Sequence, residues 1–174
     1  MNFNLQPSLA NDLICIVPLR QYDFEVLYQV ASDPLLWEQH PNKDRYRPEV
    51  FQNFFTGAME SGGAFLVKDK LTGEIIGSSR YYDWDAQKKV VAIGYTFISR
   101  NYWGKGYNMA LKKLMLDHAF QYADKVIFHI GAHNIRSQKA ISNLNAVKIG
   151  EEPIAYFGEP EKMNFVYEIS KVNW

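Results

Sequence analysis

Residues 100–108 read Arg100-Asn101-Tyr102-Trp103-Gly104-Lys105-Gly106-Tyr107-Asn108, between an apolar segment at 90–98 and an amphipathic segment at 107–122. The two glycines let the backbone turn and come close to a ligand before a helix begins. The first N–H groups of a helix lack intrahelical partners, and with the helix dipole they favour a phosphate or pyrophosphate. Lys105 adds a positive charge. The stretch therefore predicts a strand, a phosphate-binding turn and a long helix.

Two better-known phosphate-binding motifs do not fit this turn. A P-loop would place Ser or Thr directly after Gly-Lys, but Gly106 follows Lys105. A dinucleotide-binding fingerprint would place a third glycine three residues after Gly106, where Met109 stands. A G-x-G pair by itself is also compatible with an ordinary turn into a helix, so the prediction depends on other parts of the chain.

Apolar periodicity along the chain predicts a mixed α/β fold. Alternating or continuous apolar residues predict strands, and apolar residues at helical spacing predict helices. The expected strands are 13–17, 64–68, 75–82, 90–98, 126–130, 146–150 and 164–170, and the expected helices are 21–32, 48–60, 107–122 and 134–144. Short links join the second, third and fourth strands, so these should form an antiparallel meander in the central sheet, with a β-α-β unit after it.

The composition favours a folded domain without strongly charged partners. The chain has 174 residues, which suits a single domain over 1–174. Lys plus Arg total 19, as do Asp plus Glu, so no net charge attracts nucleic acid or an anionic membrane. Cys15 is the only cysteine, which excludes an internal disulfide and disfavours a cysteine-built zinc site.

The sequence also bears on location and on metals. Residues 1–11 lack the basic region and apolar run of a secretory signal, and no window approaches the roughly 18 apolar residues of a membrane helix. A cytoplasmic protein is the expectation.

His129 and His133 flank Gly131, but neither a carboxylate nor a cysteine stands near them at ligand spacing, so we assign no metal.

A second polar motif, Asn134-Ile135-Arg136-Ser137, opens the helix that follows the next strand. Together with Trp103-Gly104-Lys105-Gly106-Tyr107 it resembles the GNAT acyltransferase superfamily. Within that superfamily it is most similar to RimJ/RimL-like N-acetyltransferases, in which W-G-K-G-Y starts the long helix and N-x-x-S the following one. The resemblance covers about 13–167 and includes Asp33-Pro34 with Trp37 and Ile93-Gly94-Tyr95. It implies a GNAT-like acyl-CoA N-acyltransferase fold and transfer of the acetyl group of acetyl-CoA to a primary amine.

The resemblance also implies where acetyl-CoA binds. Backbone amides of 103–108 would hold the pyrophosphate, residues 95–98 would pair with the pantetheine arm, and Asn134 would hydrogen-bond that arm from the other side. The thioester would lie in a gap between two splayed strands, between Phe97 and Phe128. The cofactor-binding residues expected on this basis are Tyr95, Thr96, Phe97, Ile98, Trp103, Gly104, Lys105, Gly106, Tyr107, Asn108, Asn134 and Ser137.

Three positions depart from the superfamily pattern. Trp103 stands where many members have Arg or Gln, and Asn108 where Gly or Ala is usual. Ala92 stands where many Rim-type members carry a glutamate that could act as a general base. Backbone amides do not depend on these side chains, but a base would have to come from elsewhere. The candidates are water and the loop residues Glu38, His40, Asp83 and Asp85.

Direct attack of an amine on a thioester needs a deprotonated nucleophile, a polarised carbonyl and a proton for the departing thiolate. A backbone N–H near Phe97 could polarise the carbonyl. The family pattern makes Ser137 the first candidate for the proton donor and Tyr156 the second. Capping of its helix is the alternative role for Ser137.

The acceptor cannot be read from the acetyl-CoA motif, because acceptor pockets are built by loops. Among the aromatic and polar residues near loops, we expect Trp37, His40, Tyr82 and Trp84 to line the acceptor pocket. The acceptor would be a small-molecule or peptide amine. A non-catalytic acyl-CoA-binding module and an enzyme that uses a different acyl-CoA are the alternatives. A homodimer contact near Trp174 is also compatible with the sequence.

Overall fold

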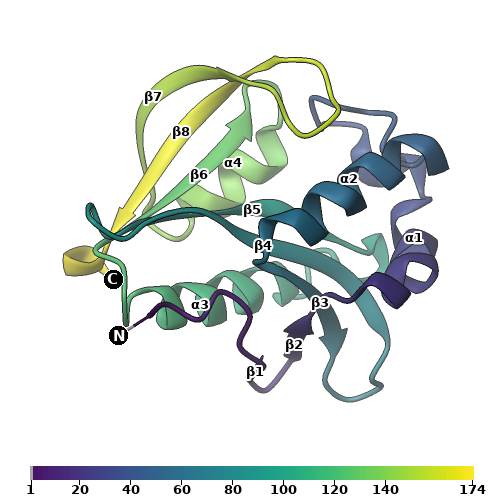
Figure 1. Cartoon of the computed structure of the whole chain (residues 1–174), viewed down its shortest axis with the longest axis horizontal. Coiled ribbons are helices and arrows are strands. Elements are labelled where there is room, and N and C mark those ends of the chain that lie inside the picture. The colour runs from purple at the N-terminus through teal and green to yellow at the C-terminus, as the bar shows by residue number, and fades with distance from the viewer. Residues whose placement is uncertain (1) are drawn as a thin grey trace.

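A computed structural model describes residues 2–174 and confirms the mixed α/β fold (Figure 1). Over these residues eight strands form one sheet: β1 (Leu9–Ala10), β2 (Ile14–Pro18), β3 (Ala64–Asp69), β4 (Ile75–Asp85), β5 (Val90–Ile98), β6 (Lys125–Gly131), β7 (Val147–Ile154) and β8 (Lys162–Ser170). The α-helices there are α1 (Phe24–Ala31), α2 (Pro48–Ser61), α3 (Tyr107–Ala119) and α4 (Ile135–Ser142). None of the helices in this part of the chain has the length and apolarity needed to span a membrane.

The strand order is β1-β2-β3-β4-β5-β6-β8-β7. Strands β2 to β5 form the expected antiparallel meander, in which each strand pairs with the next. Strand β6 then joins β5 in parallel, and α3 makes the crossover between them. Strands β6, β8 and β7 are antiparallel to one another. The predicted meander followed by a β-α-β unit is therefore confirmed.

The sheet opens between β5 and β6. These strands pair only where Val90–Ala92 face Lys125–Ile127, at the start of each strand. Beyond those residues β6 turns away from β5, which produces the divergence visible in Figure 1. The expected splay is present, and it begins directly after Ala92 and Ile127.

Helices cover both faces of the sheet, each over its own hydrophobic core. On one face, α3 and α4 contribute Leu111, Met115 and Ile141 to a core that includes Phe65 and Val91. On the other face, α1 and α2 pack Leu27, Phe51 and Phe55 against Leu66 and Phe97. Figure 1 shows α3 and α2 on opposite sides of the meander. Phe97 therefore belongs to the wall that faces α2, while Phe128 lies in the other core.

Local sequence signals explain several boundaries. Pro48 occupies the first turn of α2, where its missing N–H costs nothing, and Gly62 ends that helix in a left-handed conformation with φ 63°. The Asp33 side chain accepts a hydrogen bond from the N–H of Leu35 and so caps the short 3-10 helix Pro34–Trp37.

Several element bounds differ from the sequence-based expectation, for example at β7, which was expected to end at 150 and runs to Ile154. Strand β1 was missed, because two residues are too short for a periodic pattern. Helix α3 ends at Ala119 and not at 122, since the chain tightens into turns there, with the Tyr122 N–H donating to the Ala119 carbonyl. Strand β4 runs on to Asp85, through an irregular step at Asp83, which has φ 51°.

Candidate active site

The turn before α3 has the expected glycine conformations. Gly104 has φ 70° and Gly106 has φ 84°, both in the left-handed region that glycine adopts without a steric penalty. Gly106 is the N-cap of α3, and within residues 2–174 no side chain caps this helix end. The first-turn N–H groups are therefore left for a ligand, at the positive end of the helix dipole.

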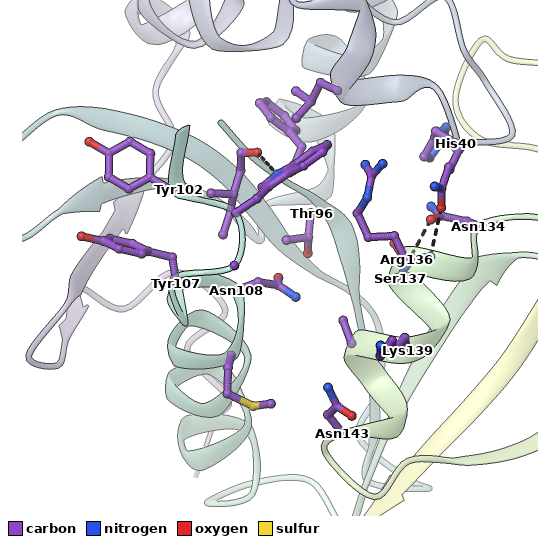
Figure 2. Close-up of a pocket in the computed structure, with 18 of the residues that line it drawn as sticks. His40, Thr96, Tyr102, Tyr107, Asn108, Asn134, Arg136, Ser137, Lys139 and Asn143 are labelled. Carbon is purple, nitrogen blue, oxygen red and sulfur yellow. Dashed lines mark hydrogen bonds between the residues drawn. The ribbon is translucent and has the colours of Figure 1, made fainter. Parts of the chain in front are cut away.

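A first cavity of about 530 Å³ lies between the start of α3 and the start of α4. Figure 2 shows Tyr107 and Asn108 on one side of it, Asn134 and Ser137 on the other, and Thr96 of β5 between them. Gly104 and Gly106 also line it, so the uncapped helix end borders an open space. The lining is largely apolar with a few convergent polar groups, as in sites for organic cofactors.

Asn134 and Ser137, the two polar residues of the motif at the N-terminus of α4, have different roles. Asn134 is the N-cap, because its side-chain oxygen accepts a hydrogen bond from the Ser137 N–H at 3.2 Å. The capping role considered for Ser137 is therefore wrong. In the described part of the chain the Ser137 hydroxyl donates to no other group, and the residue lines the first cavity and the one next to it.

A second, smaller cavity of about 110 Å³ occupies the divergence between β5 and β6. It shares Thr96, Asn108, Asn134 and Ser137 with the first cavity, so the two are contiguous. A β-bulge shapes this part of β5. Ser78 pairs with Phe97 and Arg80 with Gly94, which leaves one β4 residue opposite two on β5, and the first of these, Tyr95, has φ 53°.

Lys112 of α3 borders the second cavity and is buried, with 5% of its surface exposed. Its ammonium nitrogen donates to the Thr96 hydroxyl and lies 5.6 Å from the centre of the Phe128 ring. No carboxylate within residues 2–174 forms a salt bridge with it. Burial lowers the pKa of Lys112 to about 7. The helical periodicity does not predict the burial of Lys112, because a lysine between the apolar positions of a helix normally lies on the solvent side.

A third cavity of about 380 Å³ continues from the second on the side of the β7–β8 loop, with Tyr95, His129 and Tyr156 shared between them. His129 forms a polar chain there. Its Nδ1 lies 2.7 Å from the Tyr82 hydroxyl, and its Nε2 lies 2.9 Å from a Glu152 carboxylate oxygen. Burial lowers the pKa of His129 despite Glu152, so the ring is neutral near pH 7. From the sequence alone, His129 is considered only in relation to a metal.

A buried ion pair supports the wall behind these cavities. Arg45 binds both oxygens of Glu159, at 2.7 and 2.9 Å, and both side chains are nearly fully buried. The guanidinium also lies over the Tyr156 and Phe54 rings, at 5.2 and 5.1 Å. Because burial and the charge of Arg45 lower the pKa of the neighbouring His40, that ring is also neutral near pH 7.

The structure brings most of the predicted site residues together. The residues on the first cavity are Trp37, His40, Thr96, Phe97, Ile98, Trp103, Gly104, Gly106, Tyr107, Asn108, Asn134 and Ser137. Tyr95 and Tyr156 line the second and third cavities, and Tyr82 lines the third. Lys105 is exposed and is not part of the lining. The Tyr156 hydroxyl is engaged, since it donates to Asn164 at 2.9 Å.

The four predicted acceptor residues do not line one cavity: Trp37 and His40 lie on the first, Tyr82 lies on the third, and Trp84 is apart from them all. It packs edge-on against Phe3, with ring centroids 5.0 Å apart, and lines a separate cavity with Tyr122. The strict alternation of a strand would place Trp84 on the same face as Tyr82. The left-handed residue between them, Asp83, breaks the alternation and turns Trp84 to the opposite face.

The loop residues considered as bases are scattered. Glu38 pairs with Arg136 at 2.6 Å, and Asp85 ends β4 and accepts from the N–H groups of Gln87 and Lys88. Asp83 lines the third cavity but is exposed. Over residues 2–174, three or more His, Cys, Asp or Glu side chains do not gather anywhere in a way that could hold a metal ion.

Comparison with known proteins identifies the family. Residues 14–147 match the model of the acetyltransferase (GNAT) domain. This chain belongs to the GNAT acetyltransferase family, whose members transfer acyl groups from acyl-CoA. Among curated proteins, no sequence matches the chain significantly.

Solved structures share the fold at low sequence identity. A GCN5-related N-acetyltransferase from Brucella melitensis has a TM-score of 0.79 and 15% identity, over 97% of this chain and 80% of that one. An acetyltransferase of the GNAT family from Bacillus anthracis has a TM-score of 0.70 and 16% identity, over 95% and 99%. Mycobacterium smegmatis RimJ in complex with CoA-disulfide has a TM-score of 0.70 and 14% identity, over 90% and 81%.

Proposed function

We propose that residues 1–174 form one N-acetyltransferase domain of the RimJ/RimL-like branch, which moves the acetyl group of acetyl-CoA to a primary amine. The observation that carries this proposal is the continuity of the three cavities. The first borders the uncapped start of α3, the second fills the divergence of β5 and β6, and the third opens toward the β7–β8 loop. Cosubstrate and acceptor can thus approach one point of the sheet from opposite sides.

Acetyl-CoA fits the first two cavities. Its pyrophosphate would accept hydrogen bonds from the first-turn N–H groups of α3, beside Gly104 and Gly106. The pantetheine arm would follow the bulged part of β5 at Tyr95 and Thr96, with Asn134 across the cavity. The thioester would then lie in the second cavity. Arg136, which pairs with Glu38 and lies 3.9 Å above the Trp103 ring, also lines the first cavity.

His129 is the base in this scheme, acting through Tyr82. In the tautomer that fits both contacts, Nε2–H donates to Glu152 and Nδ1 accepts from the Tyr82 hydroxyl. As the amine attacks the thioester carbon, its proton passes to the Tyr82 oxygen while the Tyr82 proton passes to His129. Glu152 stabilises the imidazolium that forms. This relay would take the role of the glutamate that many Rim-type members carry at the position of Ala92.

Ser137 is the proton donor to the CoA thiolate. When the carbon–sulfur bond breaks, the sulfur takes the hydroxyl proton, which solvent restores. Ser137 fits this role better than Tyr156, because the Ser137 hydroxyl borders both cavities while the Tyr156 hydrogen is held by Asn164. No covalent enzyme intermediate is needed.

Calorimetric titration with acetyl-CoA, followed by a CoA-release assay with a panel of primary amines, tests the function. Micromolar binding and release that requires an amine are expected. Binding without release for any amine would favour a non-catalytic acyl-CoA-binding module. Faster release from a longer acyl-CoA would favour a different donor. Absence of binding would contradict the proposal.

A further inference from the structure

Arg80 is a charged side chain on the third cavity that the proposed reaction does not use. It is 4% exposed and lines that cavity together with Tyr82 and Tyr95. Arg80 pairs with Gly94 in the β4–β5 ladder, two residues before Tyr82, so both side chains lie on one face of β4. Its contact with the Phe54 carbonyl places it between the sheet and α2. Arg80 thus forms the inner wall of the acceptor side.

Most hydrogen-bond donors of Arg80 have no protein acceptor. Nη2 donates to the Phe54 carbonyl at 3.3 Å. Among the described residues, the buried Nε has no hydrogen-bond partner. The Tyr95 ring lies 3.7 Å from Cζ and attracts the cation, but a ring face does not replace a carboxylate as an acceptor. A guanidinium has five N–H donors. The Nε donor is enclosed by protein, so the Nη donors that the Phe54 carbonyl leaves unpaired are the ones that a ligand oxygen would take up.

The charge of Arg80 also has no dedicated counterion within residues 2–174. The nearest buried carboxylate, Glu159, already binds Arg45 with both oxygens. Asp83 lines the same cavity but is exposed, so solvent screens its charge. Burial lowers the pKa of Arg80 to about 10, which still leaves the guanidinium protonated near pH 7.

The other buried titratable groups around the acceptor side supply no negative charge to Arg80 either. His40 and His129 are neutral near pH 7, and Lys112 is itself a base. Glu152 is half exposed and faces His129. The walls of the third cavity, as far as the described residues show, therefore carry one buried positive charge without a dedicated counterion, at Arg80, and a bound anion would neutralise it.

Resting on amine acetylation as the function, we propose that the third cavity selects primary amines that carry a carboxylate, which Arg80 binds through its free N–H donors. Free amino acids and similar small amino-carboxylates are the matching class. Ile154 and Phe157 from the β7–β8 side line the same cavity and would contact the apolar part of such an acceptor. An amine of the same size with no charged group in place of the carboxylate, called a neutral amine below for that position alone, would leave the guanidinium as it is now, buried and unpaired.

The test compares matched acceptors on the unmodified protein. A set of amino acids is assayed by CoA release beside the corresponding amino acid amides and decarboxylated amines. The carboxylates are expected to have a kcat/KM at least about 10-fold higher than their neutral partners, the range for one hydrogen-bonded charge. Each compound is also titrated into the CoA-loaded protein by calorimetry, which reads binding without turnover.

Variants then assign the preference to Arg80. Arg80→Met is expected to lower kcat/KM for the carboxylates about 10- to 100-fold and to change it little for the neutral amines. Arg80→Lys should retain part of the preference, because it keeps the positive charge but loses the paired N–H donors of the planar guanidinium. Arg47→Met is the matched control, since Arg47 is exposed and lies outside the cavity lining. Unchanged acetyl-CoA affinity shows that a variant is folded.

The outcomes separate this inference from the function on which it rests. Equal or better turnover of neutral amines by the unmodified protein would overturn the inference and leave the acetyltransferase intact. An equal loss for all amines in Arg80→Met would also overturn it, because Arg80 would then serve the chemistry. Carboxylate-dependent binding without any turnover would support the site and contradict the function. Neither binding nor turnover would contradict both.

Discussion

At the scale of single residues, the site combines groups whose ordinary charge is suppressed by burial. His40 and His129 are held neutral, and Lys112 has its pKa lowered to about 7. Neutral imidazole and amine groups can accept protons, which suits the removal of the proton that the acceptor amine loses as it attacks. Such groups also make the stability of the protein depend on pH.

His129→Gln should lower kcat for amine acetylation about 100-fold, the usual loss when a general base is removed. The affinity for acetyl-CoA should change little, because His129 borders only the thioester end of the proposed site and not the first cavity, which would hold the pyrophosphate. Steady-state kinetics and calorimetry measure the two quantities. His133→Gln is the control, since His133 is exposed. A loss of less than about threefold in His129→Gln would contradict the proposed relay.

Ser137→Ala should lower kcat about 10- to 100-fold with little change in acetyl-CoA affinity, because the thiolate loses its proton donor. A leaving thiol of lower pKa departs more readily without a proton donor. An acetyl thioester of such a thiol should therefore recover part of the rate that Ser137→Ala loses. Helix α4 should stay folded, since Asn134 and not Ser137 caps it. If activity were unchanged in the variant, water would have to supply the proton.

Lys112 should make the fold more stable at alkaline pH. The unfolded lysine titrates near its ordinary value and the folded one near 7, so between these values the unfolded state binds more protons. The free energy of unfolding should therefore rise as pH increases from about 7 toward 10. Lys112→Met should remove this slope and raise stability at pH 7 by a few kcal/mol, at about 1.4 kcal/mol per pKa unit.

Urea denaturation at several pH values measures this dependence. Lys113→Met is the control, because Lys113 is the neighbouring helical residue and is exposed. A slope that persists in Lys112→Met would assign it to another group.

At the scale of elements, the site depends on two local irregularities of regular structure. The left-handed glycines before α3 leave a helix start uncapped, and the bulge at Tyr95 disturbs β5 where it leaves β6. A continuous ladder or a capped helix would satisfy its own N–H groups and offer none to a ligand. The proposed acetyl-CoA site depends on these interruptions.

Gly106→Ala should destabilise the fold by about 1–2 kcal/mol, because an alanine is strained at φ 84°. It should also weaken acetyl-CoA binding, since the helix start would shift. Gly73→Ala is a matched control, with φ 73° in the β3–β4 turn. Within the described residues, an added Cβ would meet nothing closer than 3.9 Å at either position. Equal acetyl-CoA affinity in both variants, by calorimetry, would argue against the pyrophosphate site.

At the scale of the whole molecule, contacts between distant segments hold the acceptor side closed. Arg45 follows α1, and Glu159 lies 114 residues later in the β7–β8 loop. Their ion pair is buried, and Asn42 donates a further hydrogen bond to the same carboxylate. The loop that carries Tyr156 is thereby tied to the segment that carries His40.

Glu159→Gln should therefore lower the free energy of unfolding by about 3–5 kcal/mol, because it leaves the Arg45 charge buried and unpaired. Chemical denaturation measures the change. Glu161→Gln, at an exposed position in the same loop, should change stability by less than about 0.5 kcal/mol. Similar values for the two variants would show that the ion pair contributes little.

Self-association stays a prediction. The Trp174 indole donates to Asp117 at 2.7 Å, and its ring lies 6.0 Å from the Phe120 ring, so part of this residue is engaged within its own chain. Sedimentation of the protein at several concentrations would test for a dimer, with Trp174→Ala as the variant that should weaken it.

The sequence by itself determined the meander and the β-α-β unit of the sheet, and the helix start that would bind the pyrophosphate. Both depend on local patterns, namely apolar periodicity and the glycines at 104 and 106. Asn134 and Ser137 were found in the same way, because a helix start is encoded within a few residues.

Only the tertiary structure decided the rest of the site. His129 meets Tyr82, and Lys112 enters the gap, through contacts between segments far apart in the chain. Trp84 was misplaced because one left-handed residue, Asp83, reverses the alternation of a strand. Arg80 reads as an ordinary polar residue in a strand, and its unpaired charge exists because α2 and the sheet bury it together. Burial and charge compensation depend on every segment that surrounds a residue, so a local pattern does not encode them.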